Sequence, residues 1–128
     1  MADIEQNKRN VIAYYERAFN DHEPEDAVER YVGSEYIQHN PMAPDGTDAF
    51  IAFVHSYVEQ FPQLSIEIKR AIAEGDLVMT HGLLKTSPED RGTAAADIFR
   101  LDRNGKIVEH WDVLQPVPET SANDNTMF

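Results

Sequence analysis

The stretch from Ala94 to Gln115 constrains the fold of this chain more than any other, because it has the pattern of a β-hairpin. Two runs of alternating apolar and polar residues flank Asn104-Gly105, a dipeptide that tolerates the positive φ angles of tight antiparallel turns. A two-residue turn at this dipeptide places Arg103 opposite Lys106. The sequence therefore predicts two adjacent antiparallel strands joined by a short connection.

The same turn fixes the residues that face each other across the hairpin. It sets Arg100 opposite Glu109, which is a favourable cross-strand charge pair, and Asp97 opposite Asp112. A three-residue loop would instead shift the pairing by one residue and place Asp97 opposite Trp111. The charge pair favours the first of these two registers.

Side chains alternate between the faces of a strand, so the first register separates the hairpin into two sets. One face carries Asp97, Phe99, Leu101, Val108, His110 and Asp112. The other face carries Ile98, Arg100, Ile107, Glu109 and Trp111. Two carboxylates and an imidazole on one half-apolar face make a candidate site for proton transfer.

Length and composition exclude several classes of protein. With 128 residues the chain is expected to form one domain with a real hydrophobic core. The net charge of −12 argues against a nucleic acid or an anionic membrane as partner, since both attract basic surfaces. The absence of cysteine excludes disulfides and a thiol nucleophile. The sequence shows no secretory signal and no apolar run of membrane-spanning length, so we expect a cytoplasmic protein.

The order of predicted elements indicates an α+β domain. Apolar residues recur at helical spacing over residues 6–20, 24–31 and 47–60. Alternating runs over 64–72 and 77–85 then predict two strands before the hairpin, which gives about four antiparallel strands. We expect a single domain over residues 1–115, with the helices on one face of a curved sheet. Residues 116–128 form a polar tail that is either disordered or docked on another subunit.

Two motifs give the chain a resemblance to a known family. These are YIQHNP at residues 36–41 and DIFRLDRNGKIVEHWD at residues 97–112. With them the chain resembles the SnoaL-like polyketide cyclases and their relatives predicted to catalyse aldol condensations, within the nuclear transport factor 2-like superfamily. The resemblance implies three N-terminal helices packed on a strongly curved antiparallel sheet, which forms a cone with an internal pocket. Proteins with this fold include isomerases, hydratases, epoxide hydrolases, cyclases and binding proteins.

The resemblance also suggests roles for single residues. In SnoaL-like cyclases the proton carrier corresponds to Asp112. Ketosteroid isomerases, which share the superfamily, have an oxyanion-hole aspartic acid at a place similar to Asp97, and a first-helix tyrosine that corresponds to Tyr14 or Tyr15. Their general base lies near His39, where this sequence has no acid, which argues against steroid-type isomerisation.

The candidate site residues follow from these two arguments together. The expected catalytic residues are Asp112, Asp97 and His39, and the expected substrate-binding residues are Tyr15, Tyr36, His81, Phe99 and His110. Each has a structural alternative, since buried aromatic residues fill cores and histidines often bond to nearby backbone groups. His39, His81 and His110 could join an aspartate around a metal ion, but their spacing does not favour it, and no metal or cofactor is expected.

The resulting hypothesis is a cofactor-independent enzyme that performs aldol, retro-aldol or cyclisation chemistry on a small apolar or cyclic carbonyl compound. The alternative is a non-catalytic module that binds a small molecule or another protein. An isomerase or an epoxide hydrolase is a lesser alternative; the latter needs an arginine between two aspartates, and Arg100 is expected on the opposite face. The convex face of the sheet, with Ile98, Ile107 and Trp111, is expected to form a homodimer.

Overall fold

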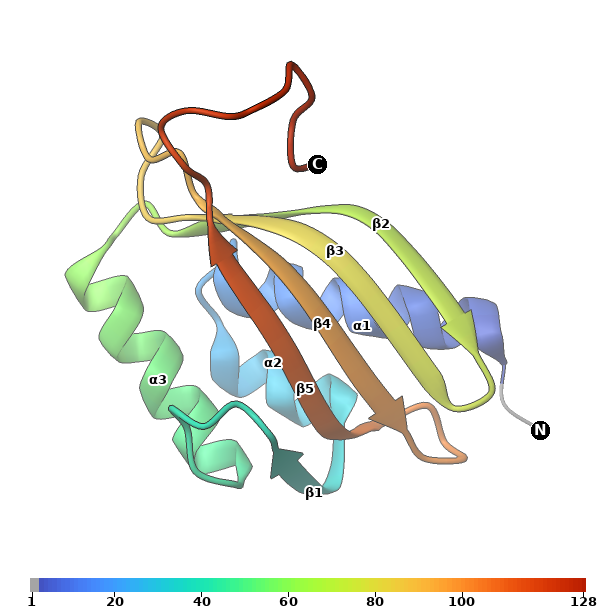
Figure 1. The fold of residues 1–128 in the computed structure, drawn as a ribbon. Helices are drawn as coiled ribbons and strands as arrows, with labels where there is room; N and C mark the ends of the chain where they lie inside the picture. Colours follow the sequence, from blue (N-terminus) through green and yellow to red (C-terminus); the bar gives the residue numbers. More distant parts are fainter. Residues whose placement is uncertain (1–2) are drawn as a thin grey trace.

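The computed structural model describes residues 3–128, and it confirms the α+β class. In chain order its elements are α1 (Ile4–Phe19), α2 (Pro24–Tyr31), β1 (Val32–Gln38), α3 (Thr47–Gln60), β2 (Ser65–Glu74), β3 (Leu77–Lys85), β4 (Thr93–Leu101) and β5 (Ile107–Pro116). The helices cover one side of a curved, open sheet, with α1 running along the sheet (Figure 1). Within the described residues, no helix is long and apolar enough to cross a membrane.

The sheet is mixed, whereas the sequence predicts a purely antiparallel one. Strands β2 to β5 form the expected antiparallel series, and β1 joins the free edge of β5 in parallel, giving the order β1-β5-β4-β3-β2. The pairing of β1 with β5 is interrupted between Val32 and Ile37. This broken register explains why the segment lacks the regular alternation by which the other strands are recognised.

The hairpin pairs as predicted along most of its length, but its tip differs. Asp97 lies opposite Asp112, and Arg100 lies opposite Glu109 with its Nε 2.7 Å from the carboxylate. The tip is a longer loop in which the Asp102 N–H donates to the Lys106 carbonyl, so a two-residue turn with Arg103 facing Lys106 is wrong. A β-bulge next to the loop then restores the predicted register.

The bulge changes which residues face the core. Leu101 pairs with Ile107 and Arg100 with Glu109, so Val108 is the extra residue on β5. Ile107 and Val108 are both buried, with exposed fractions of 0% and 4%. The prediction that Ile107 lies on the convex face is therefore wrong, because the bulge turns both residues toward the interior.

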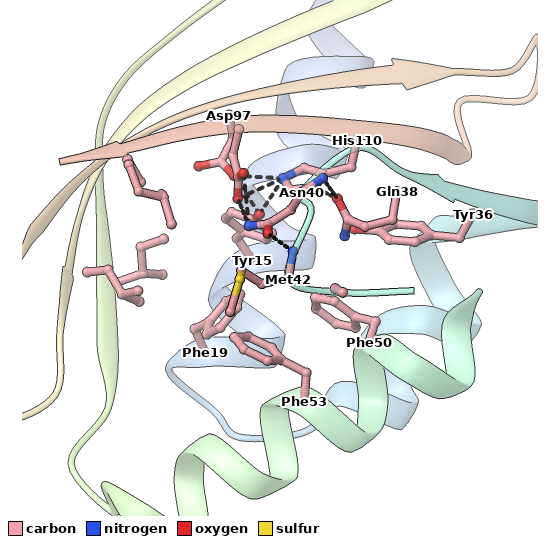
Figure 2. A pocket seen from close by; sticks show the side chains of 16 residues that line it. Tyr15, Phe19, Tyr36, Gln38, Asn40, Met42, Phe50, Phe53, Asp97 and His110 are labelled. Carbon is pink, nitrogen blue, oxygen red and sulfur yellow. Dashed lines mark hydrogen bonds and ion pairs between the residues drawn. The ribbon is translucent and has the colours of Figure 1, made fainter. Parts of the chain in front are cut away.

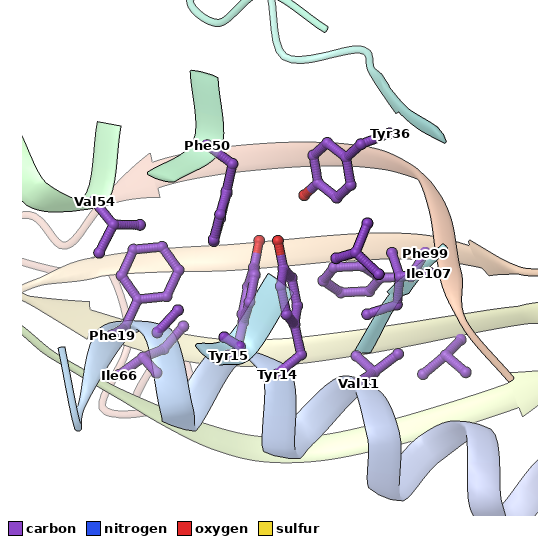
Figure 3. Packing of buried hydrophobic residues seen from close by; sticks show 14 of the residues in the cluster. Val11, Tyr14, Tyr15, Phe19, Tyr36, Phe50, Val54, Ile66, Phe99 and Ile107 are labelled. Atoms are coloured by element: carbon purple, nitrogen blue, oxygen red, sulfur yellow. The ribbon is translucent and has the colours of Figure 1, made fainter. Parts of the chain in front are cut away.

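Helix α1 supplies one wall of the core. Its apolar stripe faces the concave side of the sheet, where aromatic rings stack between helix and strands (Figure 3). Tyr15 and Phe99 meet edge to face with their ring centres 5.1 Å apart. The helix begins at an Asp3 cap, whose carboxylate accepts a hydrogen bond from the Gln6 N–H. The buried residues of this helix are Asn7, Val11, Tyr14, Tyr15, Ala18 and Phe19.

The tail after β5 turns back over the outer, convex face of the sheet (Figure 1). The Val117 N–H donates to the Gly92 carbonyl at the start of this path. At its end the Phe128 ring stacks on His81, with ring centres 5.7 Å apart, and lies beside the Lys69 ammonium. The tail thus lies on its own sheet in the single chain. Docking of the tail on another subunit stays a prediction.

Candidate active site

A cavity of about 100 Å³ lies between the concave face of the sheet, α1, α3 and the segment that follows β1 (Figure 2). A water molecule takes up about 30 Å³ in the liquid, so the cavity has room for a few water-sized groups. One end is polar and is formed mainly by β1, β4 and β5. The other end is lined by apolar side chains, among them Phe19, Phe50, Phe53, Ile66, Leu84 and Leu114.

Three side chains from three elements meet at the polar end. The Tyr15 hydroxyl donates to Asp97 Oδ1 over 2.7 Å, and His110 Nε2 lies 2.7 Å from the same oxygen. The Tyr15 oxygen and His110 Nε2 are 3.0 Å apart, which closes a triangle of polar atoms. Asp97 and His110 are exposed by only 2% and 3%. Burial of such groups is favourable only when they are paired, and here they are.

The hydrogen bonds around His110 define its tautomer. The Asn40 backbone N–H, which can only donate, lies 3.1 Å from Gln38 Oε1, and His110 Nδ1 lies 2.7 Å from that same oxygen. Because the oxygen only accepts, Nδ1 carries a hydrogen. At 2.7 Å, bare lone pairs on His110 Nε2 and Asp97 Oδ1 would repel each other. One proton therefore lies between these two atoms.

Asp112 occupies the next position on the inner face of β5. Its two carboxylate oxygens accept hydrogen bonds from Asn40 Nδ2 at 3.0 and 3.1 Å. Its side chain is 12% exposed and lines the cavity, and Oδ2 is 4.0 Å from His110 Nε2. Asn40 fixes the orientation of the carboxylate, while Asp112 keeps access to the cavity.

The tyrosines of this region are held in the neutral form. Burial, and then the charge of Asp97, raise the pKa of Tyr15 well above its ordinary value. Burial is also the main cause of the raised pKa of Tyr36, with smaller contributions from Asp97 and Asp112. Among the described residues, no lysine or arginine lines the cavity. Its polar end therefore offers tyrosine hydroxyls, the Asp97–His110 pair with its shared proton, and the Asp112 carboxylate.

Most of the residues expected at the site come together. Asp97, Asp112, Tyr15, Tyr36 and His110 all line the cavity (Figure 2). Phe99 does not line it: the ring is fully buried behind Tyr15 and belongs to the core.

His39 and His81 lie away from the cavity. His39 follows β1 and points to the outer side of the sheet, where it stacks on Trp111 with ring centres 4.7 Å apart and bonds to Glu109 over 2.7 Å. His81 lies on the outer face of β3, beside Arg70, because the alternating inner positions of that strand are occupied by residues such as Thr80. The expectation that His39 and His81 lie at the pocket is therefore wrong.

Gln38 and Asn40 line the cavity although the sequence reasoning did not select them. The signal was present: Tyr36, Gln38 and Asn40 alternate along YIQHNP and point to the same side, while His39 between them points to the other. This segment was not among the predicted strands, so its alternation was not used. Phe53 was also missed, because it is 47% exposed and lies at the mouth.

The polar end contains a possible set of metal ligands. One ligand atom from each of Asp97, His110 and Asp112 lies within 4.8 Å of the others. His110 Nε2 and Asp97 Oδ1 are, however, at a hydrogen-bond distance of 2.7 Å and share a proton. A divalent ion with ligands at about 2.0–2.2 Å would have to displace that proton and spread the two atoms apart.

The comparisons with known proteins agree with this geometry. A model of the SnoaL-like domain matches residues 11–110, which is most of the chain. The chain belongs to the SnoaL-like family. No curated protein matches the sequence. The sequence resemblance is thereby confirmed.

Solved structures share the SnoaL-like fold at low sequence identity. TsrD from Streptomyces laurentii superimposes with a TM-score of 0.74 at 18% identity, over 89% of this chain and 91% of that one. A SnoaL-like protein of unknown function from Burkholderia thailandensis gives 0.68 at 18% identity, over 88% and 98%. A candidate polyketide cyclase from Acidithiobacillus ferrooxidans gives 0.70 at 16% identity, over 89% and 91%. Such identities show a common fold, which hosts different activities.

Proposed function

We propose that this SnoaL-like protein is a cofactor-independent enzyme that performs acid/base chemistry of the aldol, retro-aldol or cyclisation type on a small carbonyl compound. The observation that carries the proposal is the position of Asp112. Its carboxylate is oriented by two contacts from Asn40 and lies between the apolar part of the cavity and the Asp97–His110 pair. A general base needs this combination of fixed orientation and access to substrate.

Asp112 is assigned as the proton carrier in preference to Asp97. Oδ1 of Asp97 already receives the Tyr15 hydroxyl and shares a proton with His110, and the residue is 2% exposed. Asp112 accepts only from Asn40 among the described side chains and borders the open space. The Asp97–His110 pair forms a polar wall whose shared proton lies near Asp112.

The lining limits the class of substrate. Since no lysine or arginine lines the described cavity and the His110 proton is engaged by Asp97, a phosphate or carboxylate group would lack a free charged partner there. The apolar end favours hydrocarbon, and the volume of about 100 Å³ favours a compact molecule. The best-suited substrate is a neutral carbonyl compound with one polar end.

The reaction can be written for a β-hydroxy ketone. Asp112 removes the hydroxyl proton, the bond between the α and β carbons breaks, and its electron pair passes to the carbonyl as an enolate. The proton then returns to the α carbon, so that one β-hydroxy ketone gives two carbonyl compounds. The reverse sequence is an aldol addition. Proton transfer by a positioned carboxylate contributes about 10²–10⁴-fold to such a rate.

The test uses two neutral probes followed by NMR: diacetone alcohol for cleavage to acetone, and cyclohexanone for exchange of its α hydrogens in deuterated water. We expect the wild type to accelerate at least one of these reactions, and Asp112→Asn to lower that rate by about 10²–10⁴-fold while remaining folded. Asp124→Asn, an exposed change in the tail, is the matched control. Full activity in Asp112→Asn contradicts the assigned role. Binding of both probes without reaction favours the non-catalytic alternative.

A further inference from the structure

Two buried hydroxyl groups beside the cavity have no hydrogen-bond partner. Tyr14 on α1 is 0% exposed and Tyr36 on β1 is 3% exposed, yet within residues 3–128 neither hydroxyl makes a hydrogen bond. Buried hydroxyls are normally paired, and those that are not call for an explanation. Tyr36 lines the cavity, whereas Tyr14 lies behind it.

The two hydroxyls point toward each other and toward the polar end. Figure 3 shows the Tyr14 and Tyr15 hydroxyls side by side, with the Tyr36 hydroxyl directed at them. Tyr36 raises the pKa of Tyr14, after burial, through its charge and a hydrogen-bond interaction, and Tyr14 lowers the pKa of Tyr36, so the two hydroxyls lie close together with Tyr14 on the donor side. Even if a small rotation joined them, one bond would use one proton, and the second O–H would still lack an acceptor.

Most other donors at the polar end are already engaged. The Tyr15 proton goes to Asp97, and both nitrogens of His110 are committed, to Gln38 and to Asp97. Asn40 Nδ2 donates to the carboxylate of Asp112. Among the described lining residues, the Tyr36 hydroxyl is the fully buried donor without an acceptor, and the less enclosed Gln38 Nε2 also makes no hydrogen bond.

We propose that the Tyr36 hydroxyl donates the hydrogen bond that holds the substrate carbonyl oxygen and stabilises it as an enolate, with the Tyr14 hydroxyl donating to the Tyr36 oxygen behind it. This inference rests on the proposed function, because it supplies the donor that an Asp112 base requires. Asp112 takes the α proton, the C–H electron pair forms the enolate, and charge develops on the oxygen bound by Tyr36. Tyr36 keeps its own proton throughout.

The environment of Tyr36 suits this role. Burial raises its pKa above the ordinary value, so the phenol remains a neutral donor at physiological pH. Both aspartates also act on it, which places its hydroxyl near the region where the carrier operates. A neutral donor in a site without lysine or arginine among its described lining residues matches a carbonyl oxygen, whose charge appears only in the transition state.

The experiment compares Tyr36→Phe with Tyr31→Phe, a change on the half-buried side of α2 outside the cavity. Exchange of cyclohexanone α hydrogens gives the rate, and the carbon-13 signal of its labelled carbonyl gives the hydrogen bond in the bound state. We expect Tyr36→Phe to lower the exchange rate by about 10²–10³-fold, as for loss of one oxyanion-hole donor. The bound carbonyl signal should move upfield, and the urea midpoint should fall only slightly, because the Tyr14 hydroxyl loses its acceptor. Tyr31→Phe should change neither the rate nor the signal.

The outcomes separate this inference from the proposed function. Loss of exchange in Asp112→Asn with full exchange in Tyr36→Phe overturns the donor role and leaves the acid/base proposal standing. If the wild type does not exchange cyclohexanone but the bound carbonyl signal differs between wild type and Tyr36→Phe, the donor role is supported and acid/base activity on this ketone is overturned. A lower exchange rate in Tyr36→Phe with an unmoved bound carbonyl signal shows that the hydroxyl acts only through the structure, which contradicts the inference. Cyclohexanone that neither binds nor exchanges, together with diacetone alcohol that is not cleaved, overturns both.

Discussion

The two faces of the β4–β5 hairpin distribute polar and apolar residues in the reverse of the usual way. The inner face carries Asp97 and His110, which are 2% and 3% exposed, at the centre of the protein. The outer face carries Ile98 and Trp111, which are half-buried, and Val113, which is 74% exposed. A sheet with one covered face normally places its apolar side chains inside and its polar ones outside. This hairpin does the opposite over the part that borders the cavity.

The difference indicates that the inner polar residues form an organised hydrogen-bond network. Each polar group on that face has a partner from another element: Tyr15 from α1, Gln38 from β1 and Asn40 from the segment after it. Networks of this kind stabilise a fold only when they are satisfied, and they occur where function requires a departure from local rules. The outer face needs no such network, because its apolar residues can be covered by a partner or by the tail.

The largest effect is expected from breaking the inner network. Asp97→Ala leaves His110 and Tyr15 buried without their shared acceptor, so the free energy of unfolding should fall by about 3–5 kcal/mol. The outer-face control Val113→Ala should change it by less than about 0.5 kcal/mol. Urea unfolding of the two variants measures the difference. Equal, small losses would show that the two faces are energetically alike.

Alkaline pH should lower the free energy of unfolding through the buried tyrosines of the inner side. Burial raises the pKa of Tyr14, Tyr15 and Tyr36 above the ordinary value of 10.0, so the folded state retains protons that the unfolded chain releases. Stability is therefore complete below about pH 10 and is lost above it, by up to about 1.4 kcal/mol per pH unit for each tyrosine. Urea unfolding from neutral pH to about pH 11 should show this fall in the free energy of unfolding. In Tyr36→Phe the fall should be less steep, because one tyrosine fewer releases a proton on unfolding. A slope unchanged by that substitution would place the ionisation elsewhere.

The fold could be predicted from the sequence where one local interaction decides between alternatives. The Arg100–Glu109 pair selected the register that brings Asp97 opposite Asp112, and this register is confirmed. The bulge at Val108 could not be predicted, because the extra loop residue and the bulge offset each other. Beyond the bulge, the strand register is the same as for a two-residue turn. For the same reason, the burial of Ile107 was missed.

The site could be predicted where strand alternation was recognised. Asp97, His110 and Asp112 follow from the hairpin alone. His39 was expected at the pocket and Asn40 was not selected, because β1 is a short edge strand with broken pairing, whose alternation is hard to recognise in sequence. The contact between Tyr15 and Asp97 joins residues far apart in the chain, and only the family resemblance indicated it.

The smallest effect on the single chain, and the sharpest test of the outer face, comes from a charge placed on it. Four apolar side chains pair across neighbouring strands in one row: Ile72, Met79, Ile98 and Trp111. Val113 lies next to this row, so Val113→Glu should leave the free energy of unfolding within about 0.5 kcal/mol while opposing any apolar contact with a second copy. Light scattering should then show a dimer for the wild type and for Ser34→Glu, an exposed change on β1, and a monomer for Val113→Glu. A wild type that stays monomeric at high concentration would refute the homodimer predicted from the sequence. The outer face would then carry exposed apolar residues that no second copy covers, in contrast to the paired polar residues of the inner face.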